Sequence, residues 1–334
     1  MAVIVGVDVG YGALKVAFGA ADAVPKVLRS PARAAPVGEV AEHIAPEHGS
    51  GLGNPLTVVM EGERWAVGFT ADQLDDGQRP PLHEDYASTQ PYRALYLAAL
   101  HLADAHRIDT LVSGLPVTAA VDAGRRDRLR QQLRGRFTPN GAPIQVHDVR
   151  VLAQPVGSYV AMLAEANEEA STLLCESTVL VLDVGHYSVD WSLIARGHLH
   201  QAVSGTSLQA TSLLIEDAAR RIAEEQGGSP PTTAIESALQ RGLTHIYYRG
   251  TRVDLMAYLH PAADRRAATA LDQMRQALRH GNLHPDVVLL TGGGADYYRS
   301  AVCAVYDGLP CLIPDEPALA NARGYFHYGA HQHR

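Results

Sequence analysis

Two stretches of the chain share one pattern of apolar and polar positions. Residues 177–194 (STVLVLDVGHYSVDWSLI) form an apolar run, a short polar turn, and a second run in which apolar and polar residues alternate. Residues 2–18 (AVIVGVDVGYGALKVAF) repeat this design, with an Asp-x-Gly triplet at 8–10 in the place of the triplet at 183–185. Runs rich in Val and Ile beside a glycine turn are typical of buried strands. The pattern therefore predicts two strand–turn–strand units, in two related halves that face one ligand.

The rest of the chain alternates between strand-like and helix-like patterns. Further predicted strands cover 56–60 and 64–68 (as a hairpin), 109–115, 145–152, 199–203, 286–291 and 310–314. Apolar residues at helical spacing predict helices over 91–106, 125–136, 155–167, 207–225 and 266–280, and a last helix from about residue 317. Residues 72–84 are expected to form a surface loop, and 232–265 a small α/β insertion. The alternation indicates the α/β class, with mostly buried sheets in two related domains and a cleft between them.

The composition of the chain indicates the cellular compartment of the protein and the classes of partner that it can bind. The chain is 46% hydrophobic, but no stretch approaches the roughly 20 consecutive apolar residues of a membrane span. The N-terminus lacks the basic region of a signal peptide, so we expect a cytoplasmic protein with no membrane contact. The three cysteines (Cys175, Cys303 and Cys311) form no CxxC pair and fit reduced thiols. The net charge of −8 argues against direct binding to nucleic acid.

Among the basic residues and the histidines, only Lys15 is a candidate functional residue. Only Lys15 and Lys26 among 28 basic residues are lysine, and Lys15 directly follows the first turn, where a compact ammonium suits a bound anion. Six arginines lie within 125–136, where two leucines spaced i, i+4 predict an amphipathic helix with a solvated basic face rather than a nucleic-acid patch. Three histidines at 327, 331 and 333 are expected in a frayed tail rather than a metal site.

The two turns suggest phosphate chemistry. A tight glycine turn presents backbone N–H groups that bind phosphate oxygens. Asp8 and Asp183 would repel phosphate unless a cation lay between them, which points to Mg²⁺ held largely through water. Ser188 adds a hydroxyl donor and Lys15 a positive charge. A third glycine site, 292–294, follows an apolar strand and opens a helix, and the chain contains neither GxxxxGK[ST] nor GxGxxG.

Five motifs together resemble one superfamily. They are DVGYGALK (8–15), LAQPVGSY (152–159), LDVGHYSVD (182–190), LTGGGA (290–295) and PALANARGY (317–325). In this order they resemble the phosphate-1, connect-1, phosphate-2, adenosine and connect-2 motifs of the actin, sugar kinase and heat-shock chaperone ATPase superfamily. More closely, the chain is similar to the StbA/ParM group of actin-like proteins, which includes members with an ALP-type N-terminal domain. The resemblance implies two actin-like (ribonuclease H-like) domains around a nucleotide cleft: residues 1–154, closed by a C-terminal helix at 318–334, and residues 155–317.

The resemblance also implies roles for particular residues. Asp8 and Asp183 would hold Mg²⁺, and Lys15 would contact the β/γ-phosphate region. Gln154, which would position the attacking water, and Asp183 would be the catalytic residues. The remaining nucleotide-binding positions would be Gly10, Tyr11, Gly12, Gly185, His186, Tyr187, Ser188, Glu216, Arg220, Gly292, Gly293 and Gly294. Of these, 292–294 would border the adenosine, and Glu216 or Arg220 would contact base or ribose. His186 and Tyr187 depart from the small residues that the family usually has in this turn.

The implied function is an ATP- and ADP-binding, Mg²⁺-dependent ATPase that assembles into filaments, for segregation of a plasmid or other DNA. Such a role requires self-association and a DNA-binding adaptor protein. One alternative is a phosphotransferase of the sugar-kinase or exopolyphosphatase branch, which would need a catalytic carboxylate where Gln154 stands. Another is a non-polymerising, ATP-switched scaffold that stays monomeric.

Overall fold

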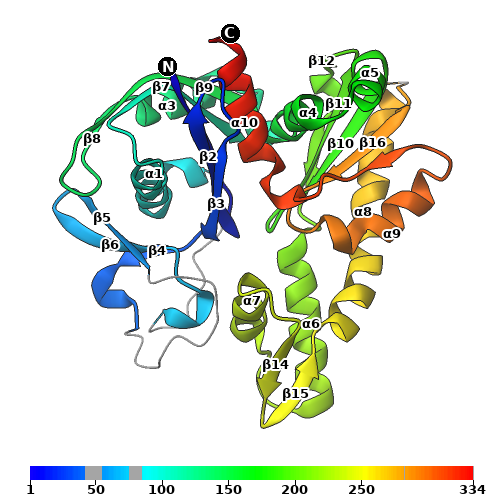
Figure 1. Cartoon of the computed structure of the whole chain (residues 1–334). Coiled ribbons are helices and arrows are strands. Elements are labelled where there is room, and N and C mark those ends of the chain that lie inside the picture. Colours follow the sequence, from blue (N-terminus) through cyan, green and yellow to red (C-terminus); the bar gives the residue numbers. More distant parts are fainter. Residues whose placement is uncertain (42–54, 75–84, 282, 334) are drawn as a thin grey trace.

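The computed structural model describes residues 1–41, 55–74, 85–281 and 283–333. Two α/β halves lie side by side, with the C-terminal helix between them (Figure 1). The predicted α/β class with two related halves is confirmed. The predicted loop at 72–84 falls mainly on residues 75–84, which lie outside the described part of the chain.

The first half is built on a six-stranded sheet with the order β3-β2-β1-β7-β9-β8. Its strands are β1 (Val3–Val9), β2 (Ala13–Ala20), β3 (Lys26–Pro31), β7 (Arg107–Leu115), β8 (Gly135–Phe137) and β9 (Ile144–Ala153). The antiparallel pair β1–β2 places Asp8 opposite Lys15, and β1 runs parallel to β7. Apart from its first residue, β1 is completely buried, which explains its continuous apolar run.

The second half repeats this arrangement. Its sheet has the order β12-β11-β10-β16-β17, with β13 also paired to β11. The strands are β10 (Thr178–Val184), β11 (Val189–Ala195), β12 (His198–Leu199), β13 (Gly205–Ser207), β16 (Val287–Thr291) and β17 (Cys311–Leu312). The pair β10–β11 places Asp183 opposite Asp190, and β10 runs parallel to β16. Both predicted strand–turn–strand units are therefore confirmed, and each forms the first two strands, in chain order, of one of the two related sheets.

Smaller elements flank the two sheets. A three-stranded sheet consists of β4 (Ala34–Pro36), β5 (Leu56–Met60) and β6 (Glu63–Val67), and a two-stranded sheet of β14 (His245–Tyr248) and β15 (Thr251–Asp254). The helices are α1 (Gln90–Leu102), α2 (Val117–Ala120), α3 (Ala123–Leu133), α4 (Gln154–Glu165), α5 (Glu168–Glu176), α6 (Thr211–Gln226), α7 (Thr232–Gln240), α8 (Met256–His280), α9 (Ala295–Val305) and α10 (Ala320–His331).

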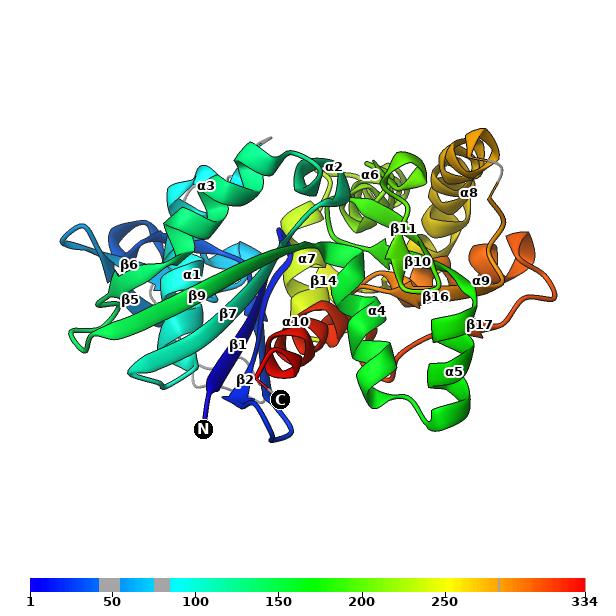
Figure 2. The ribbon, with the colours of Figure 1, turned by 90° about the horizontal axis from the view of Figure 1, so that it is seen from above.

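Helices α4 and α10 pass side by side between the halves, as Figures 1 and 2 both show. They approach so closely that a Cβ atom on Gly324 would overlap the carbonyl oxygen of Gly157. On its other side α10 packs on β1, where a Cβ atom on Gly6 would overlap the backbone of α10 at Ala322. These backbone contacts fix the C-terminal helix against the first sheet and beside the helix that leads into the second half.

Several predicted elements differ from the structure. The return strand predicted at 199–203 is reduced to β12, because the chain turns into a 3-10 helix at Gln201–Val203. The helix predicted at 266–280 is the later part of α8, which continues through Pro261. The expected frayed tail is also wrong. His327 lies in α10 beside Glu165 (3.1 Å), and the ring of His333 contacts the Thr110 hydroxyl at 2.8 Å.

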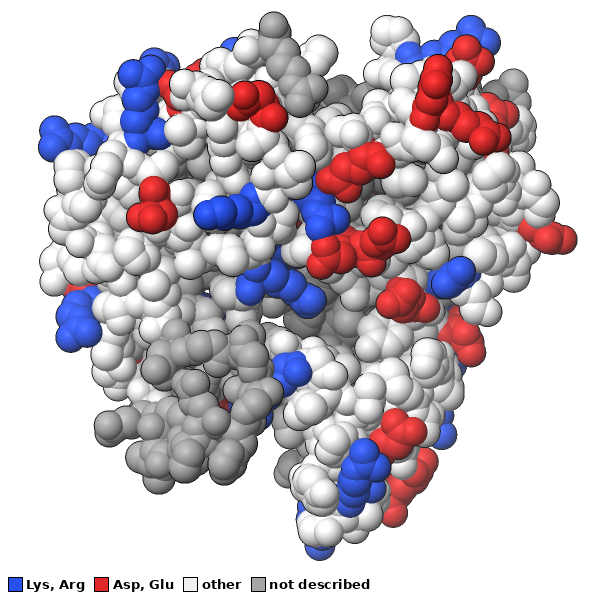
Figure 3. Space-filling model, viewed as in Figure 1, with Lys and Arg blue, Asp and Glu red and all other residues white. Residues whose placement is uncertain are grey.

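The arginine-rich segment forms the predicted amphipathic helix, α3. Leu129 and Leu133 are buried, whereas Arg130 lies outside and pairs with Asp127. Figure 3 shows charges of both signs interspersed among the described residues of one face of the molecule. Among the described residues, no helix combines the length and the apolar character that crossing a membrane requires.

Candidate functional site

One cavity of about 620 Å³ lies where the two halves meet. The turns of both strand–turn–strand units open into it, together with the first residue of α4 and the turn after β16. Twelve of the sequence-predicted site residues line it: Asp8, Gly10, Tyr11, Gly12, Lys15, Gln154, Asp183, Gly185, His186, Tyr187, Ser188 and Gly293. Residues 175 positions apart in the sequence are thus brought to one site by the repeated strand order.

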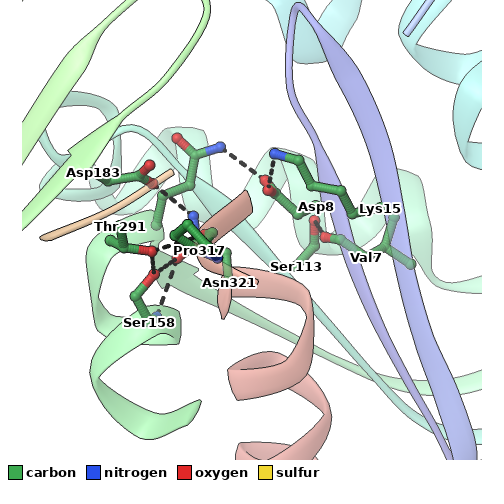
Figure 4. Close-up of polar contacts among 10 residues, drawn as sticks. Val7, Asp8, Lys15, Ser113, Ser158, Asp183, Thr291, Pro317 and Asn321 are labelled. Atoms are coloured by element: carbon green, nitrogen blue, oxygen red, sulfur yellow. Dashed lines mark hydrogen bonds and ion pairs between the residues drawn. The ribbon is translucent and has the colours of Figure 1, made fainter. Parts of the chain in front are cut away.

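Asp8 is the last residue but one of β1 and is only 2% exposed. The Nζ atom of Lys15 lies 2.7 Å from its Oδ2, because the antiparallel register places the two residues opposite each other (Figure 4). The side-chain amide of Gln154 donates to Oδ1 of Asp8 at 3.1 Å. Asp8 therefore has a cationic partner and a second donor that comes from α4.

Asp183 occupies the equivalent place at the end of β10 and has a different environment. Burial raises its pKa to about 7, the charge of Lys15 opposes this rise, and the carboxylates of Asp8 and Asp190 add to it. Its hydrogen-bond partner is a neutral amide, since Nδ2 of Asn321 donates to Oδ2 at 2.7 Å (Figure 4). A cation in the cavity would stabilise the charged form of this carboxylate.

The pair of aspartates fits Mg²⁺ better than a metal held by protein alone. Among the described residues, no group of three or more His, Cys, Asp or Glu side chains is arranged to hold a metal ion. Mg²⁺ usually takes one or two carboxylates and completes its shell with water and substrate phosphates. Asp8 and Asp183 supply this kind of incomplete oxygen set.

Asp190 is a site residue that the sequence reasoning did not select. It is 2% exposed and lines the cavity from β11. Its carboxylate accepts hydrogen bonds from the hydroxyls of Ser188 (2.6 Å) and Thr206 (2.5 Å). Burial raises its pKa, and these hydroxyls oppose the rise. The sequence signal that could have identified it is a carboxylate within an apolar strand, opposite Asp183 in the hairpin.

The two turns contact each other through His186. A Cβ atom on Gly12 would lie 2.8 Å from the Cβ of His186, so the first turn needs glycine at this place. Tyr11 stacks on Tyr86 with ring centroids 4.1 Å apart, and Tyr187 lies against Tyr11 at 4.9 Å. The two bulky residues that depart from the family pattern therefore pack on the opposite turn.

The glycines after β16 have separate roles. Gly292 has φ +90°, and a Cβ atom there would overlap the carboxylate of Asp183. Gly294 similarly abuts Thr211 and Val184. Gly293 lines the cavity, and its nearest neighbour would be 4.0 Å from an added Cβ. The glycine triplet thus serves close packing at both ends and leaves space at its centre.

The two residues predicted to contact base or ribose do not line the cavity. Glu216 and Arg220 lie on the exposed side of α6, and Arg220 pairs with Asp217. Thr211 and Ile215, on the same helix, do line the cavity. Contact of Glu216 or Arg220 with a nucleotide stays a prediction.

Contacts across the cavity join the halves at a second place. The Arg33 guanidinium lies 2.8 Å from the Glu236 carboxylate, and both side chains are 6% exposed. Next to them, Asp72 accepts from Arg241 at 2.6 Å, and its backbone N–H donates to the hydroxyl of Ser237 at 3.0 Å. No sequence motif indicated these pairs, because their members lie more than 160 positions apart.

Comparisons with known proteins agree with this architecture. Residues 6–157 match the family model for the N-terminal domain of actin-like proteins. Residues 181–302 match the model for the C-terminal domain of archaeal, MreB-like actin homologues. No curated protein matches the chain in sequence.

Solved structures resemble the whole chain. The archaeal actin homologue Ta0583 is 21% identical, with a TM-score of 0.74 over 98% of both chains. ParM in a 15-stranded filament from Clostridium botulinum is 17% identical, with a TM-score of 0.74 over 99% of both chains. ParM from Bacillus thuringiensis with ATP is 15% identical, with a TM-score of 0.63 over 99% of both chains. At such identities the likeness shows the fold alone. Two family models of actin-like proteins, one for residues 6–157 and one for residues 181–302, thus match this chain, and its fold is the actin-like fold of these structures.

Proposed function

We propose that the cavity binds ATP and ADP with Mg²⁺ and that the protein hydrolyses ATP. The observation that carries this proposal is the paired placement of Asp8 and Asp183, which are the last residues but one of equivalent strands in the two sheets and line one cavity. Related structures hold ADP, AMPPNP or ATP, which supports nucleotide binding in this fold.

The chain's own residues account for each part of such a site. Backbone N–H groups of the turns at 10–12 and 185–187 would bind phosphate oxygens, and Lys15 would add charge to the β/γ-phosphates. Mg²⁺, held by Asp8 and Asp183, would neutralise charge on the phosphates. The amide nitrogen of Gln154 is engaged by Asp8. Its carbonyl oxygen would therefore be the atom that orients the attacking water.

We further propose that ATP favours assembly into filaments and that hydrolysis destabilises them. ParM relatives form filaments, as the structure from Clostridium botulinum shows for that protein. By analogy with the StbA/ParM group, the role that we propose for these filaments is segregation of a plasmid or other DNA in the cytoplasm. The net charge of −8 favours contact with DNA through a DNA-binding adaptor protein rather than directly.

Light scattering and sedimentation with Mg·ATP test the filament proposal, with EDTA and with ADP as comparisons. We expect scattering that needs both Mg²⁺ and ATP and a pelleted fraction that grows with protein concentration. Absence of polymer at tens of micromolar protein over a range of salt would overturn it. ATP turnover by a monomer would then favour the ATP-switched scaffold.

A further inference from the structure

Asn321, the second residue of α10, joins the two halves beside the candidate metal site. It is buried, at 6% exposed. Its Nδ2 donates to Oδ2 of Asp183 at 2.7 Å, and its Oδ1 accepts from both the backbone N–H (3.1 Å) and the hydroxyl (2.7 Å) of Ser158. A backbone N–H can only donate, so the atom facing Ser158 must be the amide oxygen. The NH₂ group is therefore committed to Asp183.

The partner of Asn321 is itself fixed. Ser158 on α4 is completely buried, and its hydroxyl lies 3.1 Å from that of Thr291, at the end of β16. The Thr291 hydroxyl in turn donates to the carbonyl of Pro317 at 2.9 Å, just before α10 (Figure 4). Four elements thus hold the amide in one orientation.

The carboxylate of Asp183 is held from two sides. One oxygen accepts from Asn321, and the other lies so close to Gly292 that a Cβ atom there would overlap it. Asp8 differs, because the positive charge of Lys15 lies 2.7 Å from it. A neutral amide fixes a carboxylate without cancelling its charge, and that charge then remains for a cation.

We propose that Asn321 is a positioning residue that orients the Asp183 carboxylate toward the divalent cation. The proposal deepens the proposed function and rests on it. Because α10 packs on β1 whereas Asp183 belongs to β10, this orientation also depends on how the first half sits against the second. The cation site is therefore complete only while the two halves keep this relation.

The test compares two variants that disturb the same buried network. Asn321→Ala removes the donor to Asp183, whereas Ser158→Ala removes a hydroxyl but keeps the amide and its backbone partner. Mn²⁺ serves as the probe, and its binding to the ADP-loaded protein is measured by electron paramagnetic resonance. We expect Asn321→Ala to weaken Mn²⁺ binding about tenfold, as for the loss of one hydrogen bond to a charged group, and Ser158→Ala to change it by less than about twofold. ADP binding in EDTA should be unchanged in both.

Asn167→Ala is the matched control, since it removes an asparagine that caps α5 through its contact with the N–H of Ala170. It should leave Mn²⁺ binding unchanged. Should Asn321→Ala not fold, Asn321→Ser is used, because its side chain is too short to bridge both partners. Wild-type Mn²⁺ affinity in a folded Asn321 variant, or an equal loss in Ser158→Ala, would overturn the positioning role. If the wild-type protein bound neither ADP nor Mn²⁺, the proposed nucleotide site itself would be wrong.

Discussion

Arg33 and Glu236 form an ion pair of 2.8 Å across the cavity, with both side chains buried. Arg33 directly precedes β4 in the first half, and Glu236 lies on α7 in the second. In the sequence they are 203 positions apart. The pair is one of the contacts that keep the two halves together on the side of the cavity away from α4 and α10.

Removal of one partner of this ion pair should lower the stability of the protein. Glu236→Leu leaves the guanidinium of Arg33 buried without its carboxylate, so we expect the free energy of unfolding to fall by about 3–5 kcal/mol. The double variant Arg33→Met/Glu236→Leu should recover much of this loss. Urea denaturation measures the free energy of unfolding of the single and the double variant.

The exposed pair Asp127–Arg130 provides the control. Its members are 58% and 44% exposed, so Asp127→Ala should cost less than about 1 kcal/mol. Equal effects of Glu236→Leu and Asp127→Ala would contradict the assigned role of burial.

Asp183→Ala should abolish ATP hydrolysis and leave the fold intact. The carboxylate is one of two that face the cavity as candidate Mg²⁺ ligands, and alanine removes it without adding bulk. A phosphate-release assay with saturating Mg·ATP measures the rate, and circular dichroism checks the fold. Unchanged turnover in a folded variant would show that Asp183 holds no essential cation.

The metal-free protein should lose stability as the pH rises. Burial raises the pKa of Asp183 to about 7, so the folded protein holds a proton there that the unfolded chain releases above about pH 4. Because the folded state binds more protons in this window, the free energy of unfolding falls between about pH 4 and pH 7.

Asp183→Asn removes this titration. In EDTA, its melting temperature should therefore rise relative to that of the wild type between about pH 5 and pH 8. Thermal melts followed by circular dichroism measure this difference, and Asp127→Asn, on the exposed face of α3, is the control. Parallel curves for Asp183→Asn and the wild type would argue against the raised pKa.

Gly324→Ala tests the contact between α4 and α10. The new methyl group would overlap the carbonyl oxygen of Gly157, and because both atoms belong to packed helices the strain cannot be relieved by a side-chain rotation. We expect a loss of about 2 kcal/mol or more in the free energy of unfolding. Gly38→Ala is the control, since an added Cβ there meets no atom within 4 Å. A Gly324→Ala variant as stable as Gly38→Ala would refute the close approach.

The sequence was informative where a signal is local. The turns at 8–12 and 183–188 could be recognised because strand, glycine and aspartate follow one another within a few residues. The same holds for the hairpin β5–β6, whose turn is formed by Glu61 and Gly62 at positive φ. Family motifs then allowed these turns to be assigned to one cavity.

Contacts between distant segments carried no such signal. Nothing in the sequence pairs Arg33 with Glu236, or Asn321 with Asp183, although Asn321 lies within a recognised motif. Short strands such as β3, β4 and β8 were missed because few of their residues are buried and no alternation marks them. The tail was misjudged because its order comes from packing of α10 on β1, which a polar C-terminal sequence does not reveal.

Three neighbouring tyrosines at the cavity provide an intrinsic spectroscopic probe of the distance between the two halves. Tyr11 and Tyr86 belong to the first half, whereas Tyr187 lies in the turn between β10 and β11 of the second half. The ring centroids of Tyr187 and Tyr11 are 4.9 Å apart. Aromatic rings this close couple their transitions, so the near-ultraviolet circular dichroism of the protein reports the separation of Tyr187 from the other two. A rotation of one half against the other can therefore be followed in solution without attaching any label.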